Sequence, residues 1–185
     1  MKPYVKVLAC VSILVAGVVA VASATQLAYL TPQELGQQSE LVFRGKVVSV
    51  NSYWNDKHTK VFTRTRVAVD ETYKGSSWAV VDVVQLGGTV GKVKVTVQGT
   101  LQWNVGEEVL LFAESYDAGS FQVSGFSQGK FGIKRDSRTG AAYVQAPQVE
   151  GVTLLGAPSV QGPIQTSGTE RVPLEVFVNQ ALGRR

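Results

Sequence analysis

The sequence has 185 residues, with 18 Lys and Arg, 14 Asp and Glu, and one cysteine, Cys10. Without residues 1–24, 16 basic and 14 acidic side chains leave a net charge of +2, which argues against binding to nucleic acid or acidic lipid. The same remainder has no cysteine, which excludes a disulfide, a thiol nucleophile and a zinc–thiolate site. About 160 residues suffice for one packed core and predict a single domain.

Residues 1–24 have the three parts of a cleavable secretory signal peptide. Two lysines precede an apolar run at residues 7–21, and the small residues Ala22-Ser23-Ala24 follow it. The apolar run is shorter than the ~20 residues that a bilayer span needs, which argues against an uncleaved anchor. Cys10 precedes most of this run, whereas a lipidated cysteine follows it. We therefore expect cleavage near Ala24 and an exported protein, periplasmic or secreted, with no remaining transmembrane anchor.

The first predicted elements after the signal peptide are a helix and a long strand. Thr31-Pro32-Gln33-Glu34 combines an N-cap, a proline at the first helical position and a glutamate at the third. This capping box predicts a short helix over residues 32–39. From residue 41 to Tyr53 the chain is rich in β-branched and aromatic residues, which predicts one long strand with a bulge at Gly45.

Alternation of apolar and charged residues predicts the next strand, from Val61 to the region of Tyr73-Lys74-Gly75. Its expected inward positions are Val61, Thr63, Thr65, Val67 and Val69. Residues 78–86 form a third β run, and residues 87–91 are expected to turn the chain into a strand at residues 93–97.

The second half of the chain continues the β pattern. Residues 108–113 are apolar at consecutive positions, as in a strand that is buried on both faces. Residues 121–126 and 130–135 supply further strands, and a turn at residues 136–140 leads into residues 141–144.

The last part of the chain divides into a loop and a helix. Residues 145–168 are rich in Gln, Gly, Pro and Ser with little periodicity, which predicts a surface loop or linker outside the core. Within residues 169–185, an apolar stripe on one side predicts an amphipathic helix that begins at Pro173 and docks on the sheet. The stripe consists of Leu174, Phe177, Val178, Ala181 and Leu182.

These elements predict a mainly β fold: a small antiparallel OB-like barrel over residues 25–144, with a short N-terminal helix and a C-terminal amphipathic helix. Residues 39–48, followed by a threonine-rich strand that closes in Tyr73-Lys74-Gly75, resemble the first half of the netrin-like module of tissue metalloproteinase inhibitors, an OB-fold barrel. The same layout, with Gly87-Gly88, Gly106-Glu107-Glu108 and Gly129-Lys130-Phe131, resembles uncharacterised exported bacterial proteins. The resemblance spans roughly residues 32–135 and implies a fold. The inhibitors' zinc-chelating N-terminal cysteine and their disulfides have no counterpart here, so it implies no inhibitory residues.

One string resembles a catalytic motif. Gly125-Phe126-Ser127-Gln128-Gly129 matches the G-x-S-x-G nucleophile elbow, but no histidine follows it and a strand is predicted after it. The order His58, then Asp70 or Asp82, then Ser127 is that of a trypsin-like protease. A small secreted serine hydrolase that uses Ser127 and His58 is therefore the alternative function. A bulge glycine on each side of a polar turn explains the string more simply.

Other site types find little support. His58 is the sole histidine and lacks the clustered ligands of a zinc site, so we expect no metal or cofactor. Gly87-Gly88-Thr89-Val90-Gly91-Lys92 fails the phosphate-loop pattern at two positions. An OB barrel could bind nucleic acid through aromatic and basic side chains, here Trp54, Trp78, Trp103, Arg64 and Arg66. The predicted export and the near-neutral charge argue against this function.

The predicted binding residues lie where the first long strand ends. Tyr53 and Trp54 directly precede the polar run Asn55-Asp56-Lys57-His58, which is a rim position in a barrel. Exposed aromatic residues beside polar groups are typical of binding hot spots. The competing interpretation is that both rings fold back over the barrel end. We therefore expect an exported, non-enzymatic barrel that binds a protein or polymer outside the cytoplasm through Tyr53, Trp54 and His58.

Overall fold

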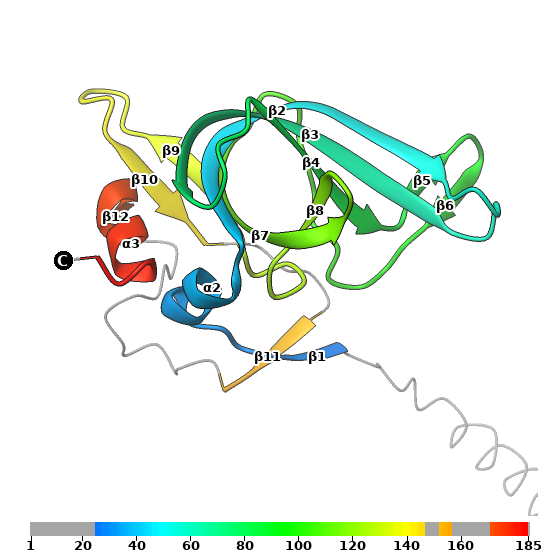
Figure 1. Cartoon of the computed structure of the whole chain (residues 1–185), viewed down its shortest axis with the longest axis horizontal. Coiled ribbons are helices and arrows are strands. Elements are labelled where there is room, and N and C mark those ends of the chain that lie inside the picture. The colour runs from blue at the N-terminus through cyan, green and yellow to red at the C-terminus, as the bar shows by residue number, and fades with distance from the viewer. Residues whose placement is uncertain (1–24, 147–151, 157–170, 185) are drawn as a thin grey trace, which may run out of the picture.

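The computed structural model describes residues 25–146, 152–156 and 171–184, so the predicted signal peptide lies outside the described residues. The described chain is mainly β, with two short helices, and eight of its strands form one sheet in the order β12-β10-β9-β7-β2-β3-β4-β8 (Figure 1). Neither of these helices has the length and hydropathy of a membrane span.

The elements are β1 (Thr25–Ala28), α2 (Pro32–Gln38), β2 (Leu41–Trp54), β3 (Val61–Lys74), β4 (Val80–Leu86), β5 (Gly88–Val90), β6 (Val93–Val95), β7 (Glu108–Asp117), β8 (Ser120–Val123), β9 (Lys130–Arg135), β10 (Ala142–Gln145), β11 (Val152–Leu155), β12 (Val172–Pro173) and α3 (Leu174–Ala181).

The predicted capping box of α2 is confirmed. The Thr31 hydroxyl accepts a hydrogen bond from the Glu34 backbone N–H, and the Glu34 carboxylate accepts one from the Thr31 N–H at 2.7 Å. These bonds satisfy backbone donors that the first turn of a helix leaves free. Leu35 then anchors the helix, because its side chain is 1% exposed.

Strands β2 and β3 form a long antiparallel hairpin with fourteen residues in each strand. The register of the hairpin shifts between Arg44 and Gly45, but the extra residue there is Asp70 of β3. The predicted bulge of β2 was therefore misplaced, because the unpaired residue of β2 is Val48. A Cβ at Gly45 would lie 2.2 Å from the carbonyl oxygen of Ala68, so a larger residue does not fit. The inward face of β3 is as predicted: Val61, Thr63, Thr65 and Val67 are buried, and Val69 is partly buried against the same cluster.

Strand β7 joins two parts of the sheet. It pairs with β2, β8 and β9, while β8 pairs with β4, so strands β7-β2-β3-β4-β8 form a closed ring of pairings. One buried cluster lies inside this ring and includes Phe43, Val67 and Leu111. A second cluster, with Phe112, Phe131 and Phe177, packs between the sheet and the helices. Because β7 supplies side chains to both clusters, its predicted burial on two faces is confirmed.

Helix α3 closes the second cluster. Its stripe is confirmed, since Leu174, Phe177, Val178 and Ala181 are each at most 2% exposed and Leu182 packs against them. Pro173 is the N-cap, one residue before the helix begins.

Several predicted boundaries were wrong. Strand β4 begins at Val80 instead of residue 78, and β6 ends at Val95. The predicted turn at residues 87–91 contains strand β5, which pairs with β6. Strand β8 ends at Val123, because residues 124–129 form turns in which Gly125 and Phe126 have positive φ.

The prediction of a loop over residues 145–168 was wrong at residues 152–155. These residues form β11, which pairs in parallel with β1 at the other end of the chain. Each strand has only four residues and its partner is remote in sequence, so neither shows a periodic pattern. Residues 147–151 and 157–170 lie outside the described residues.

Candidate partner-binding site

The structure places Tyr53 and Trp54 on opposite faces of the β2–β3 hairpin, because successive side chains of a strand alternate in direction. Tyr53 pairs with Phe62, and Trp54 pairs with the inward-facing Val61. The Tyr53 ring stacks on Phe62 with centroids 6.1 Å apart, whereas Trp54 stacks on His58 at 6.3 Å. The predicted rim patch is therefore two separate surfaces. Both rings are partly exposed and belong to neither buried cluster.

An aromatic row runs along the outward face of the hairpin. It continues from Tyr53 through Phe62 to Tyr116 near the end of β7, where the ring centroids of Phe62 and Tyr116 are 6.4 Å apart. The Arg64 guanidinium lies 5.0 Å from the centroid of Tyr53, which is cation–π geometry. Tyr116 is 44% exposed, so the row ends at the surface.

Beside this row lies a cavity of about 460 Å³, which we call the outer hollow. It forms between β4 and the β7–β8 hairpin, because β8 pairs with β4 at a single register position, Val83 with Phe121. The residues that line it include Phe62, Leu86, Tyr116 and Phe126, with Val83 and Leu101 among the buried ones. Leu86 and Phe126 are 38% and 47% exposed. Apolar side chains from β3, β4, β7 and the turn after β8 thus meet at one place.

The backbone of Phe126 is strained. Its φ is +68°, a left-handed conformation that costs a residue with a Cβ roughly 1–2 kcal/mol. Neighbouring residues hold the turn that contains it. The side-chain amide of Gln128 accepts a hydrogen bond from the Leu30 N–H and donates one to the Ala28 carbonyl oxygen, both at 2.9 Å. The Ser124 hydroxyl is also 2.7 Å from that of Ser39. The surroundings therefore hold an exposed phenylalanine in a conformation that glycine adopts more readily.

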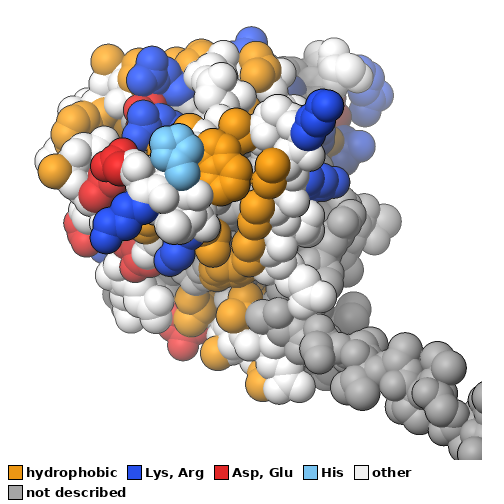
Figure 2. Space-filling model, turned by 90° about the vertical axis from the view of Figure 1, so that its right-hand side faces the viewer, with side chains coloured by type: hydrophobic (Ala, Val, Ile, Leu, Met, Phe, Trp, Pro, Cys, Tyr) orange, Lys and Arg blue, Asp and Glu red, His pale blue; other side chains and the backbone are white. Residues whose placement is uncertain are grey.

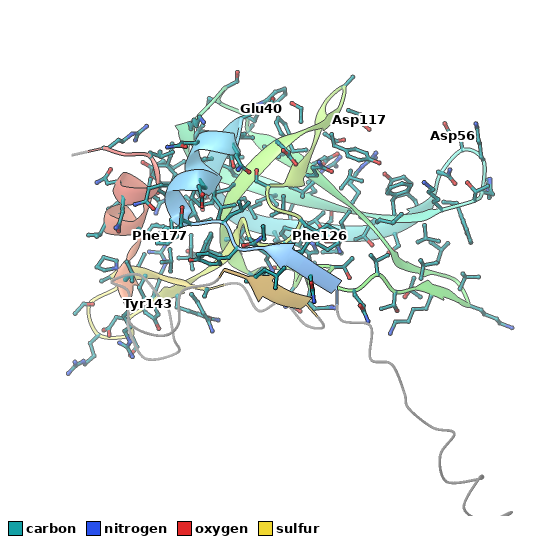
Figure 3. All side chains as sticks on the ribbon, turned by 90° about the horizontal axis from the view of Figure 1, so that it is seen from below. Glu40, Asp56, Asp117, Phe126, Tyr143 and Phe177 are labelled. Carbon is teal, nitrogen blue, oxygen red and sulfur yellow. The ribbon has the colours of Figure 1, made fainter. Side chains whose placement is uncertain are left out.

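The catalytic alternative lacks its geometry in this structure. The side chain of Ser127 is fully buried, and its hydroxyl has no hydrogen-bond partner among the described residues. His58 is exposed in the β2–β3 turn, where its Nδ1 lies 3.4 Å from the carbonyl oxygen of Asp56. In Figure 3, Asp56 marks that turn and Phe126 marks the turn with Ser127, and the two lie apart. Ser127 and His58 are thus not joined as a nucleophile and its base must be.

Asp82 and Asp70, the candidate acids of the triad, do not lie in a catalytic arrangement. Asp82 accepts a hydrogen bond from Arg66 at 2.9 Å and lies 3.9 Å from Arg64. The hydrogen bond from Arg66 lowers the pKa of Asp82, with the charges of Arg66 and Arg64 adding to it. Asp70 is exposed on β3. Among the residues that the structure describes, no three His, Cys, Asp or Glu side chains are grouped as metal ligands would be.

Sequence reasoning missed Phe62, Leu86, Tyr116 and Phe126 as site residues. The alternation in β3 placed Phe62 on the outward face, but nothing local indicates that the other three meet it there. The chain matches no protein-family model and no curated protein. A functional assignment therefore comes from the geometry of these side chains.

Proposed function

We propose that this chain is an exported, non-enzymatic binding protein, built on an OB-like barrel, that binds a protein partner outside the cytoplasm through the outer hollow. The closed ring of pairings and the register shifts along the β2–β3 hairpin support an OB-like barrel of the netrin-like kind. The signal-peptide pattern of residues 1–24 supports export.

The observation that carries the proposal is the convergence of four partly exposed apolar side chains on one hollow. Phe62, Leu86 and Tyr116 come from three different strands, and Phe126 comes from the turn after β8. Single exposed apolar residues are ordinary on a protein surface, whereas a group around a cavity is typical of an interaction site. The strain at Phe126 adds weight, because strained residues persist where function requires them.

The composition of the surface favours a protein partner. Aromatic residues and arginine are enriched in protein interfaces, and here Arg64 lies against Tyr53 at the end of the aromatic row. Two polar side chains at the hollow, Glu114 and Gln122, bond each other at 2.9 Å, while Lys60 is exposed at its edge. The apolar rim is therefore free to accept an apolar side chain of the partner. Burial of such an anchor in a dry pocket is how hot spots supply most of the binding energy.

The proposal is tested by affinity capture from the extracytoplasmic fraction of the host. The immobilised chain is used as residues 25–185, in wild-type form and as Phe126→Gly, Tyr116→Ala and Trp78→Ala. Trp78 is the matched control, because it is as exposed as Tyr116 at 44% and does not line the outer hollow. We expect the wild type and Trp78→Ala to retain the same partner protein. Each hollow variant should retain at least about tenfold less of it, as for a hot spot worth about 2 kcal/mol.

Phe126→Gly separates loss of binding from loss of folding, because glycine accepts a φ of +68° without strain. Each variant's unfolding is measured on the same preparation. Equal capture by the wild type and both hollow variants, all folded, would contradict the proposal.

A further inference from the structure

The positive charge of the described chain is concentrated at one end of the molecule. Lys57 and Lys60 lie in the turn between β2 and β3, and Lys92 and Lys94 lie on the β5–β6 hairpin. With Asp56, these four lysines give a net charge of +3, and we call them the basic end. The other described residues carry eleven basic and eleven acidic side chains. The near-neutral charge of the whole chain thus conceals a local excess.

The two hairpins of the basic end pack directly against each other. A Cβ at Gly88 of β5 would lie 2.3 Å from the hydroxyl oxygens of both Ser52 and Thr63, which shows how closely the backbones approach. The Thr89 N–H also donates a hydrogen bond to the Ser52 hydroxyl at 3.2 Å. Figures 1 and 3 both show β5 and β6 beside the β2–β3 hairpin, with the two ends on the same side of the molecule.

The four lysines are not neutralised by neighbouring acids. Each is exposed, and within the described ranges none of their ammonium groups forms a hydrogen bond or an ion pair. Lys130 shows the contrast, because it pairs with Glu107 at 2.7 Å and donates to the Gln102 carbonyl oxygen at 2.6 Å. The ammonium groups of the basic end are therefore free to bind anions.

We infer that the basic end binds an acidic polysaccharide. Four ammonium groups spread over two hairpins match a chain of repeating anionic groups, whereas a single small anion reaches one of them. The stacked rings of Trp54 and His58 lie at the same end of the β2–β3 hairpin as Lys57 and Lys60. Figure 2 shows the histidine beside hydrophobic side chains, with both basic and acidic side chains on the same face. These rings offer a flat surface to a sugar ring.

Two other anionic partners fit less well. Insertion into a lipid surface needs an apolar tip, but residues 55–60 of the β2–β3 turn are all polar, and on the β5–β6 hairpin Val93 is the sole exposed apolar side chain, between two lysines. Nucleic acid is bound chiefly inside cells, and the inference rests on the export in the proposed function. It does not depend on the outer hollow, which lies on the opposite face of the hairpin from Trp54.

The test measures binding of residues 25–185 to polygalacturonate at several salt concentrations. The variant Lys57→Gln/Lys92→Gln/Lys94→Gln keeps Lys60, which also lines the outer hollow. Its matched control is Lys46→Gln/Lys134→Gln/Arg138→Gln, which removes three exposed charges elsewhere. We expect the first variant to bind about tenfold or more weaker with a shallower salt dependence, and the control to bind like the wild type. Neutral dextran should not bind.

Three results would overturn the inference: no binding of polygalacturonate by the wild type, an equal loss in both triple variants, or tighter binding to phosphatidylglycerol vesicles or a single-stranded oligonucleotide. None of these results would change the capture of a protein partner and its loss in Phe126→Gly. Failure of this inference is therefore distinguishable from failure of the proposed function. Unfolding of both triple variants is measured to verify that each is folded.

Discussion

The two halves of the β2–β3 hairpin have the same secondary structure and different surroundings. In the inner half, Leu41, Val42 and Phe43 are at most 2% exposed, because β7 pairs with β2 over residues 41–46 and both faces are covered. In the outer half β2 has passed β7, and Tyr53 and Trp54 are partly exposed. One hairpin thus supplies both the core and the candidate binding surfaces. The inner half fixes the position of the hairpin. The exposed side chains of the outer half are therefore not needed for folding and can contact partners.

The largest expected difference between the halves is in stability. Phe43→Ala should lower the free energy of unfolding by about 3–5 kcal/mol, because it removes a fully buried ring and leaves a cavity. Tyr53→Ala, at a partly exposed position, should lower it by less than about 1 kcal/mol. Denaturant unfolding of both variants measures the two values. Similar losses for the two would mean that the Tyr53 ring is part of the core.

A second difference concerns alkaline pH. Tyr73 lies near the end of β3 in the inner half and is 8% exposed. Its hydroxyl lies 3.3 Å from a carboxylate oxygen of Glu71 and 3.3 Å from one of Glu175, and its single proton is shared between them. Burial raises the pKa of its hydroxyl above the ordinary 10.0, and the charges of Glu175 and Glu71 add to this. The neutral hydroxyl is thus favoured in the folded chain, so its contribution is complete below pH 10 and is lost as the pH rises above it.

The wild type should therefore lose up to about 1.4 kcal/mol per pH unit above pH 10 through this group. In Tyr73→Phe this loss should disappear. The matched control is Tyr53→Phe in the outer half, which should keep the alkaline loss. Unfolding measured from pH 8 to pH 11 tests this, and an unchanged alkaline loss in Tyr73→Phe would contradict the assignment.

The binding surface should be less sensitive to substitution than the core. Phe126→Gly should change the free energy of unfolding by no more than about 1 kcal/mol, because relief of the backbone strain offsets the loss of a ring that is 47% exposed. Tyr116→Ala, which removes an exposed ring without relieving strain, should change it by less than about 0.5 kcal/mol. A loss of about 3 kcal/mol or more in Phe126→Gly would mean that the ring supports the fold.

The smallest effect is expected for the lysines of the basic end. Lys57→Gln/Lys92→Gln/Lys94→Gln should leave the free energy of unfolding within about 0.5 kcal/mol of wild type, because these exposed groups have no ion pairs within the described chain. Lys130→Gln, which breaks the pair with the half-buried Glu107, should cost more than the triple variant. The reverse order in thermal unfolding would mean that the basic end has a structural role.

Elements with local signals were predictable from the sequence. The capping box set the start of α2, the alternation of β3 set its buried face, and the stripe of α3 set the side that docks. Each signal depends on residues within one or two turns or on a period of two. The burial of β7 on two faces was likewise evident from its consecutive apolar residues.

Features that depend on remote segments were not predictable. Strands β1 and β11 pair across most of the chain, and the outer hollow exists because β4 and β8 diverge after one paired position. The separation of Tyr53 from Trp54 is different, because adjacent strand residues face opposite sides and the sequence contained that signal. The positive φ of Phe126 has no sequence signal, since phenylalanine rarely adopts it.

Site-specific photo-crosslinking in the native host tests the central claim most directly. A benzophenone side chain is placed at Leu86, which is 38% exposed and lines the outer hollow, or at Val105, which is 67% exposed and does not line it. The proposed function predicts a discrete protein adduct from position 86 and none from position 105. An adduct from position 105 alone, or equal adducts from both positions, would contradict it.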